Sequence, residues 1–128
     1  MYALVNDVAA YPEFLPWCRA SRVLDSSATH MRASLELARG GVARWFTTAN
    51  VLVPDRSIAI ELERGPFKAL GGTWTFEPIG PGCKVTLDMA FEFEGMLLDL
   101  TLGPVLSDIF GSLLDAFVAR AAARARLS

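Results

Sequence analysis

The centre of the chain consists of short segments in which apolar and polar residues alternate, a period of two that is typical of strands with one buried face. In the clearest of them, every second residue from Val85 to Phe93 is large and apolar. Pairs of glycine and proline residues separate the segments and indicate short turns. Because short turns join neighbouring strands, we expect an antiparallel meander. The predicted strands are residues 30–37, 42–53, 57–63, 73–77 and 83–94.

Both ends of the chain follow a helical period instead. The apolar spacing within residues 4–8 predicts a short helix, which Pro12 should end. One apolar stripe over residues 105–121 predicts a long C-terminal helix. Gly103-Pro104 should interrupt its start, so that residues 96–102 form a separate lead-in helix. Since the helix stripe needs the apolar sheet face as its partner, we predict an α+β fold.

The composition is apolar for a globular domain. Of 128 residues, 52% are hydrophobic and 20% are charged, and the mean hydropathy is +0.34. Globular chains usually have about 45–50% apolar and about 25% charged residues. A membrane-spanning helix needs about 18 consecutive apolar residues, and Asp99, Asp108 and Asp115 interrupt the candidate stretches. The excess therefore belongs to a core, a cavity or an adhesive surface.

Charge and cysteine content exclude further classes. The net charge is −2 and the pI is about 5.3, so the chain has no overall basic field for DNA. The two cysteines, Cys18 and Cys83, do not form a disulfide framework, which suits a reducing compartment. The N-terminus lacks the basic and apolar regions of a signal peptide. We expect a cytoplasmic protein, with a peripheral position at the inner membrane as a further option.

Two segments carry a more specific signal than the periodicity. Residues 2–18 (YALVNDVAAYPEFLPWC) and 65–76 (GPFKALGGTWTF) resemble the coenzyme Q-binding START-like family, within the polyketide cyclase/dehydrase and lipid-transport superfamily. The resemblance covers residues 1–128 as one domain. It implies the helix-grip (START/Bet v 1-like) fold, in which a bent antiparallel sheet wraps around the C-terminal helix and encloses an apolar cavity. The resemblance implies a further strand inside the sheet before Met1, so we expect either that the start was assigned too late or that the domain is short and this first strand is missing. A missing strand would leave two strand edges unpaired.

The resemblance also suggests which residues form the ligand site. Phe14 and Leu15, in a proline-bounded turn, and Lys68, on a loop predicted at residues 66–70, are candidates for the cavity mouth or a membrane contact. Packing in the core, or for Lys68 simple solvation, is the alternative for each. The residues expected to line the cavity are Phe67, Leu70, Trp74, Phe76, Leu87, Met89, Phe91, Leu106, Ile109, Phe110, Leu113 and Phe117.

Residues with catalytic chemistry are sparse in the pattern. His30 is the lone histidine, on the polar face of a strand, so neither a metal site nor a catalytic pair can be built around it. Cys18 has the character of a small buried hydrophobe. Asp88, Glu92 and Glu94 fall on the outer face of the sheet, where carboxylates are solvated. We expect no catalytic residue, no metal and no required cofactor.

The leading functional hypothesis is non-enzymatic binding of ubiquinone or a related lipid, in support of respiratory electron transport. The resemblance also implies a first alternative, a ribosome-association toxin that binds the large ribosomal subunit and blocks subunit association. The acidic pI disfavours RNA contact, although Arg120, Arg124 and Arg126 could supply some. The second alternative is a polyketide cyclase or aromatase, which requires titratable groups in the cavity. The expected partners are a hydrophobic small molecule, a membrane surface or the large ribosomal subunit, and not DNA.

Overall fold

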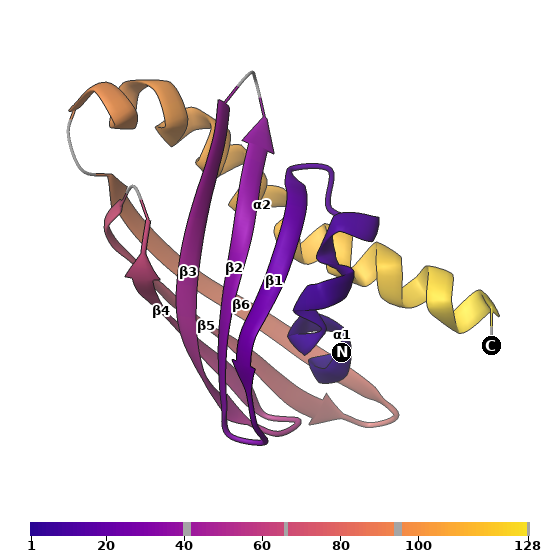
Figure 1. Ribbon diagram of the computed structural model, residues 1–128. Coiled ribbons are helices and arrows are strands. Elements are labelled where there is room, and N and C mark those ends of the chain that lie inside the picture. Colours follow the sequence, from indigo (N-terminus) through magenta and orange to yellow (C-terminus); the bar gives the residue numbers. More distant parts are fainter. Residues whose placement is uncertain (40–41, 66, 94–95, 128) are drawn as a thin grey trace.

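A curved antiparallel sheet wraps around one long helix in the computed structural model, and two short helices lie beside the first strand (Figure 1). The structure describes residues 1–39, 42–65, 67–93 and 96–127. The structure describes only the backbone of residues 39, 42, 67, 68, 93, 96–103, 105, 106 and 125–127.

The order of the six strands in the sheet is their order in the chain. All neighbouring strands are antiparallel, which confirms the predicted meander. The strands are β1 (Cys18–Ser26), β2 (His30–Arg39), β3 (Val42–Val53), β4 (Ser57–Arg64), β5 (Phe67–Ile79) and β6 (Gly82–Phe93). The helices are α1 (Tyr2–Asn6), the 3-10 helix η1 (Val8–Glu13) and α2 (Met96–Leu127).

Apolar residues of neighbouring strands share one face of the sheet because of the strand register. Leu35 lies opposite Phe46, and Trp74 lies opposite Leu87. The middle of α2 packs on this inner face and contributes Ile109, Leu113 and Phe117 to the buried core. The α+β helix-grip architecture expected from the sequence is therefore confirmed.

The loop predicted at residues 66–70 is wrong over residues 67–70, because β5 runs without interruption from Phe67 to Ile79, and residue 66 lies outside the described residues. The pair Gly71-Gly72, expected to mark the end of that loop, lies within the strand. A Cβ atom on Gly72 would stand 2.2 Å from the Asp88 carbonyl oxygen and 2.3 Å from the sulfur of Met89. The glycine therefore permits the close approach of β6 and does not end a strand.

Two helix boundaries also differ from the prediction. The helix α2 continues through Pro104, although residues 96–102 were expected to form a separate helix. Proline in a helix interior removes one hydrogen bond and costs about 3 kcal/mol, and α2 tolerates it without ending. Figure 1 shows α2 change direction in its first, orange part. The first helix, α1, already ends at Asn6, and Pro12 lies inside the following helix η1, one residue before its end.

Strand β1 was not predicted at all. Its sequence, CRASRVLDS, shows no regular alternation, and only Cys18 is buried. Register shifts after Cys18 and Val23 move side chains out of phase with β2. Within the described residues, β1 and β6 are the end strands of the sheet. The missing first strand stays a prediction.

Candidate functional site

An apolar cavity of about 70 Å³ lies between the inner face of the sheet and α2. This volume is several times the roughly 10–15 Å³ that one buried water needs, and well below the roughly 300–1,000 Å³ of a typical ligand pocket. The described lining residues are Val8, Tyr11, Trp17, Ala33, Leu35, Phe46, Thr48, Asn50, Ile60, Leu70, Trp74, Met89, Phe110, Leu113 and Phe117.

Aromatic rings form the wall of the cavity on the side of α2. Phe117 is only 1% exposed, and its ring lies 5.2 Å from Trp74, 5.4 Å from Tyr11 and 5.2 Å from Phe14, measured between centroids. All three contacts are edge-to-face, the arrangement that the ring quadrupoles favour. Phe117 thus joins α2 to the sheet and to η1 in one contact cluster.

Burial holds two ionisable groups in their neutral forms, Tyr11 on the cavity lining and Cys18 in the core. The Tyr11 hydroxyl donates a hydrogen bond to the Val5 carbonyl, and burial raises the pKa of Tyr11. Burial also raises the pKa of the Cys18 thiol to about 11. A protonated thiol is a poor nucleophile. The buried cysteine is therefore inert at neutral pH, as its interpretation as a small hydrophobe requires.

Thr48 and Asn50 place polar atoms in an otherwise apolar lining. They lie two residues apart on the inner face of β3, and each is 8% exposed. The side-chain oxygen Oδ1 of Asn50 is buried and has no hydrogen-bond partner among the described residues. The described lining holds no carboxylate, imidazole, lysine or arginine. The site can therefore enclose an apolar group and contact it at the polar atoms of Thr48 and Asn50, and it offers no acid–base pair.

The structure brings half of the predicted cavity residues together. Those on the described lining are Leu70, Trp74, Met89, Phe110, Leu113 and Phe117. Four others pack in or against the core beside the cavity, and they are Phe76, Leu87, Phe91 and Ile109. The side chains of Phe67, Lys68 and Leu106 lie outside the described residues.

Two of the three residues predicted at the cavity mouth, Phe14 and Leu15, pack in or against the core. Leu15 is 1% exposed, and Phe14 is half-buried. The guanidinium carbon of Arg120 lies 5.0 Å from the centroid of the Phe14 ring, and Arg120 also pairs with Glu13 at 3.0 Å. This contact fastens η1 to the C-terminal half of α2.

Sequence reasoning missed the lining residues of the N-terminal segment and of strands β2 to β4. A usable signal was present in β3, where Phe46, Thr48, Asn50 and Leu52 occupy alternate positions. The two polar residues in this row concealed the buried face. The missed residues are Val8, Tyr11, Trp17, Ala33, Leu35, Phe46, Thr48, Asn50 and Ile60.

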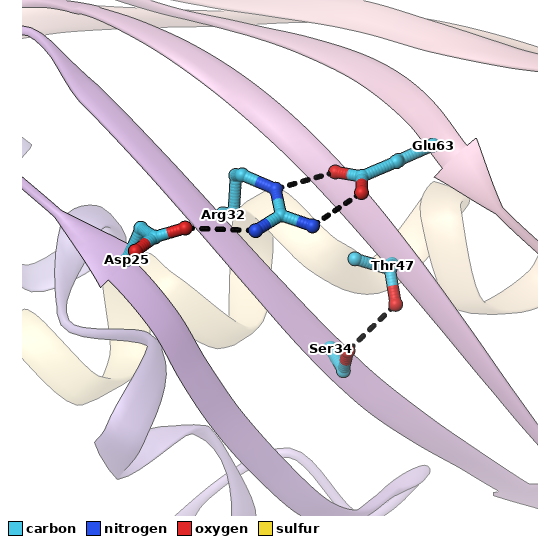
Figure 2. Close-up of polar contacts among 5 residues, drawn as sticks. All are labelled: Asp25, Arg32, Ser34, Thr47 and Glu63. Atoms are coloured by element: carbon cyan, nitrogen blue, oxygen red, sulfur yellow. Dashed lines mark hydrogen bonds and ion pairs between the residues drawn. The ribbon is translucent and has the colours of Figure 1, made fainter.

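The outer face of the sheet carries charged and hydroxyl side chains that bind one another (Figure 2). Arg32 donates hydrogen bonds to Asp25 at 2.7 Å and to both carboxylate oxygens of Glu63. This bonding lowers the pKa of Glu63. Ser34 and Thr47 form a further hydrogen bond of 2.6 Å. Because these groups bind one another across neighbouring strands, they hold the strands in register and form no reaction centre.

The other titratable residues singled out in the sequence are also on this outer side. His30 is exposed, with its Nδ1 atom 2.9 Å from the Thr29 hydroxyl. Asp88 and Glu92 are exposed, and Glu94 lies outside the described residues. The described part of the chain contains no group of His, Cys, Asp and Glu that could hold a metal ion. No helix among the described residues is long and apolar enough to cross a membrane.

Comparison with known proteins places this geometry in a family. The model of the family "Polyketide cyclase / dehydrase and lipid transport" matches residues 1–118. The Ribosome association toxin RatA of Pseudomonas aeruginosa is 50% identical over 122 residues, which are 94% of this chain and 85% of the toxin. A mitochondrial coenzyme Q-binding protein homologue of Xenopus laevis is 30% identical over 102 residues, which are 76% of this chain and 42% of that protein.

A solved structure shows the same architecture. The Zhui aromatase/cyclase of Streptomyces superposes with a TM-score of 0.79 at 18% identity, over 97% of this chain and 86% of that one. At this identity the likeness shows the fold alone. The family match and the sequence relatives together establish that the chain belongs to the polyketide cyclase/dehydrase and lipid-transport family.

Proposed function

We propose that this chain associates with the ribosome and acts as a toxin of the RatA type, which binds the large subunit and blocks subunit association. The observation that carries the proposal is the 50% identity to the Ribosome association toxin of Pseudomonas aeruginosa over 94% of this chain. A cytoplasmic location follows from this function.

The C-terminal part of α2 is a candidate for the ribosomal contact. Figure 1 shows this yellow part of the helix extending beyond the sheet. Of the three arginines expected to contact RNA, Arg120 is engaged with Glu13 and Phe14, whereas Arg124 is exposed. The side chain of Arg126 lies outside the described residues. Arg124 is therefore the described arginine of the three that is best placed to reach a phosphate.

We expect the purified protein to co-sediment with isolated large ribosomal subunits and not with small ones. If phosphate contacts contribute, the affinity should fall steeply as salt rises, because each contact releases counterions. Sedimentation of the protein with either subunit over a series of salt concentrations measures both effects. Recovery of the protein only in the unbound fraction, with both subunits at low salt, would contradict the proposal.

The variant Arg124→Gln tests the contact itself. It should weaken binding and reduce the slope of log affinity against log salt by about one, the change expected for one lost phosphate contact. The matched control is Arg56→Gln, which removes an exposed arginine in the turn between β3 and β4. If the two substitutions weaken binding equally, Arg124 acts only through the overall charge of the protein and not through a specific contact.

A second candidate function is the binding of an apolar small molecule such as ubiquinone in the cavity. It is supported by the cavity itself and by the similarity to a coenzyme Q-binding protein homologue. The described volume of about 70 Å³ requires α2 and the sheet to separate before a quinone ring can enter. We propose no reaction for the bound molecule, because the described lining holds no carboxylate, imidazole, lysine or arginine, and its tyrosine, Tyr11, donates its hydroxyl to the Val5 carbonyl.

Lipid extraction of the freshly purified protein, followed by mass spectrometry, tests this second function. We expect one apolar molecule per chain, and saturable quenching of tryptophan fluorescence by added short-chain ubiquinone, since Trp17 and Trp74 line the cavity. Protein that is empty as purified and does not respond to the added quinone would refute it. Ribosome co-sedimentation is independent of this outcome.

A further inference from the structure

The cavity contains a hydrogen-bond acceptor whose presence the packing of the fold does not explain. Asn50 Oδ1 is buried on the inner face of β3 and has no partner among the described residues. A buried polar group without a partner destabilises a fold, and an apolar residue of similar shape in its place is neutral or stabilising. Leucine at this position would serve packing better, because the surrounding cavity walls are apolar.

The surroundings of Asn50 leave room for a partner. The cavity of about 70 Å³ opens beside the amide, and Thr48 brings a hydroxyl group to the same face of the same strand. Cross-strand neighbours of Asn50 are Met31 and Ile60, which cannot accept or donate a conventional hydrogen bond. The donors on the other lining residues, the hydroxyl of Thr48 among them, do not bond to Oδ1. A molecule inside the cavity can supply the missing donor.

We propose that the cavity binds an apolar molecule that carries a hydroxyl or another hydrogen-bond donor, and that this donor binds Asn50 Oδ1. The inference rests on the second candidate function and specifies its ligand. A phenol, an alcohol or the reduced, hydroxyl-bearing form of a quinone fits this chemistry. An oxidised quinone presents only acceptors, and a hydrocarbon presents neither, so both leave Oδ1 unpaired.

Para-cresol and para-xylene are suitable probes, because they have nearly the same shape and differ by a hydroxyl in place of a methyl group. Calorimetric titration of the full chain gives the ratio of their affinities. We expect this cresol-to-xylene ratio to fall about two- to tenfold in Asn50→Leu, the worth of one neutral hydrogen bond. Without ligand, Asn50→Leu should also have a Tm a few degrees above that of the wild type, because the unpaired buried amide has been removed.

The matched control is Asn6→Leu. Asn6 Oδ1 is also buried without a partner among the described residues, but Asn6 is not part of the described cavity lining. The ratio should stay at the wild-type value in this variant. If Asn50→Leu does not fold, the affinity ratio can be measured in Asn50→Ala, which removes the same amide.

The possible outcomes distinguish an error in the role of Asn50 from an error in the apolar-ligand function on which it rests. A fall of the ratio in the Asn50 variant alone supports the proposal. If both probes bind and the ratio is unchanged by Asn50→Leu, the cavity is a ligand site and the role given to Asn50 is wrong; a resident water then explains the amide. If neither probe binds the wild type, the apolar-ligand function and the inference both fail.

Discussion

Replacing Phe117 by alanine should lower the free energy of unfolding by about 3–5 kcal/mol, the usual loss for a buried phenylalanine. The side chain is 1% exposed and contacts Trp74, Tyr11 and Phe14. Its removal enlarges the existing cavity and also ends three aromatic contacts, each of which adds to the effect of burial. Urea denaturation followed by circular dichroism measures the change.

The control for this substitution is the next residue of the same helix. Val118 is 52% exposed, so Val118→Ala should change the stability by no more than about 0.5 kcal/mol. Similar losses in the two variants would mean that α2 does not pack on the sheet through Phe117, and would contradict the description of the cavity wall.

Gly72→Ala should be the other strongly destabilising change, by about 1–3 kcal/mol, the range for overpacking a core. The new Cβ would lie 2.2 Å from the Asp88 carbonyl oxygen, which belongs to the backbone of β6 and cannot rotate away. The strands must separate at this point, where Gly72 pairs with Met89. The midpoint of thermal unfolding is a sufficient measurement.

A second glycine provides a control of opposite sign. A Cβ on Gly111, in the middle of α2, would meet nothing within 4 Å. Gly111→Ala should therefore stabilise the protein by about 0.5–1 kcal/mol through helix propensity. If both glycine variants shift the midpoint in the same direction, the close approach of β5 and β6 is not what determines the effect at Gly72.

The fold could be predicted from the sequence where burial and periodicity agree. Alternation identified β2, β3, β4 and β6, and the helical stripe identified the partner of the sheet. The prediction was wrong at Gly71-Gly72, because a glycine that bounds a loop and a glycine packed closely against a neighbouring strand cannot be distinguished in a sequence. It failed at β1 because register shifts and exposure remove the alternation there.

The cavity was harder to predict than the fold. The apolar residues of β5, β6 and α2 were found by their chemistry, since lining and core residues have the same composition. Asn50 was missed because buried faces are recognised in a sequence by their apolar residues, and an amide on such a face does not fit that pattern. What separates a filled core from a cavity is side-chain volume summed over many elements, which no local pattern contains.

The contact of Arg120 with Glu13 has a consequence for the order of folding. The two residues are 107 positions apart in the chain, whereas each hairpin of the sheet joins neighbours. Contacts that close large loops cost more entropy and form later. We expect the sheet to assemble first and the chain ends to join over it last. In the Phe117→Ala variant this order would appear as faster unfolding with nearly unchanged refolding. The cavity would then exist only in the fully folded state.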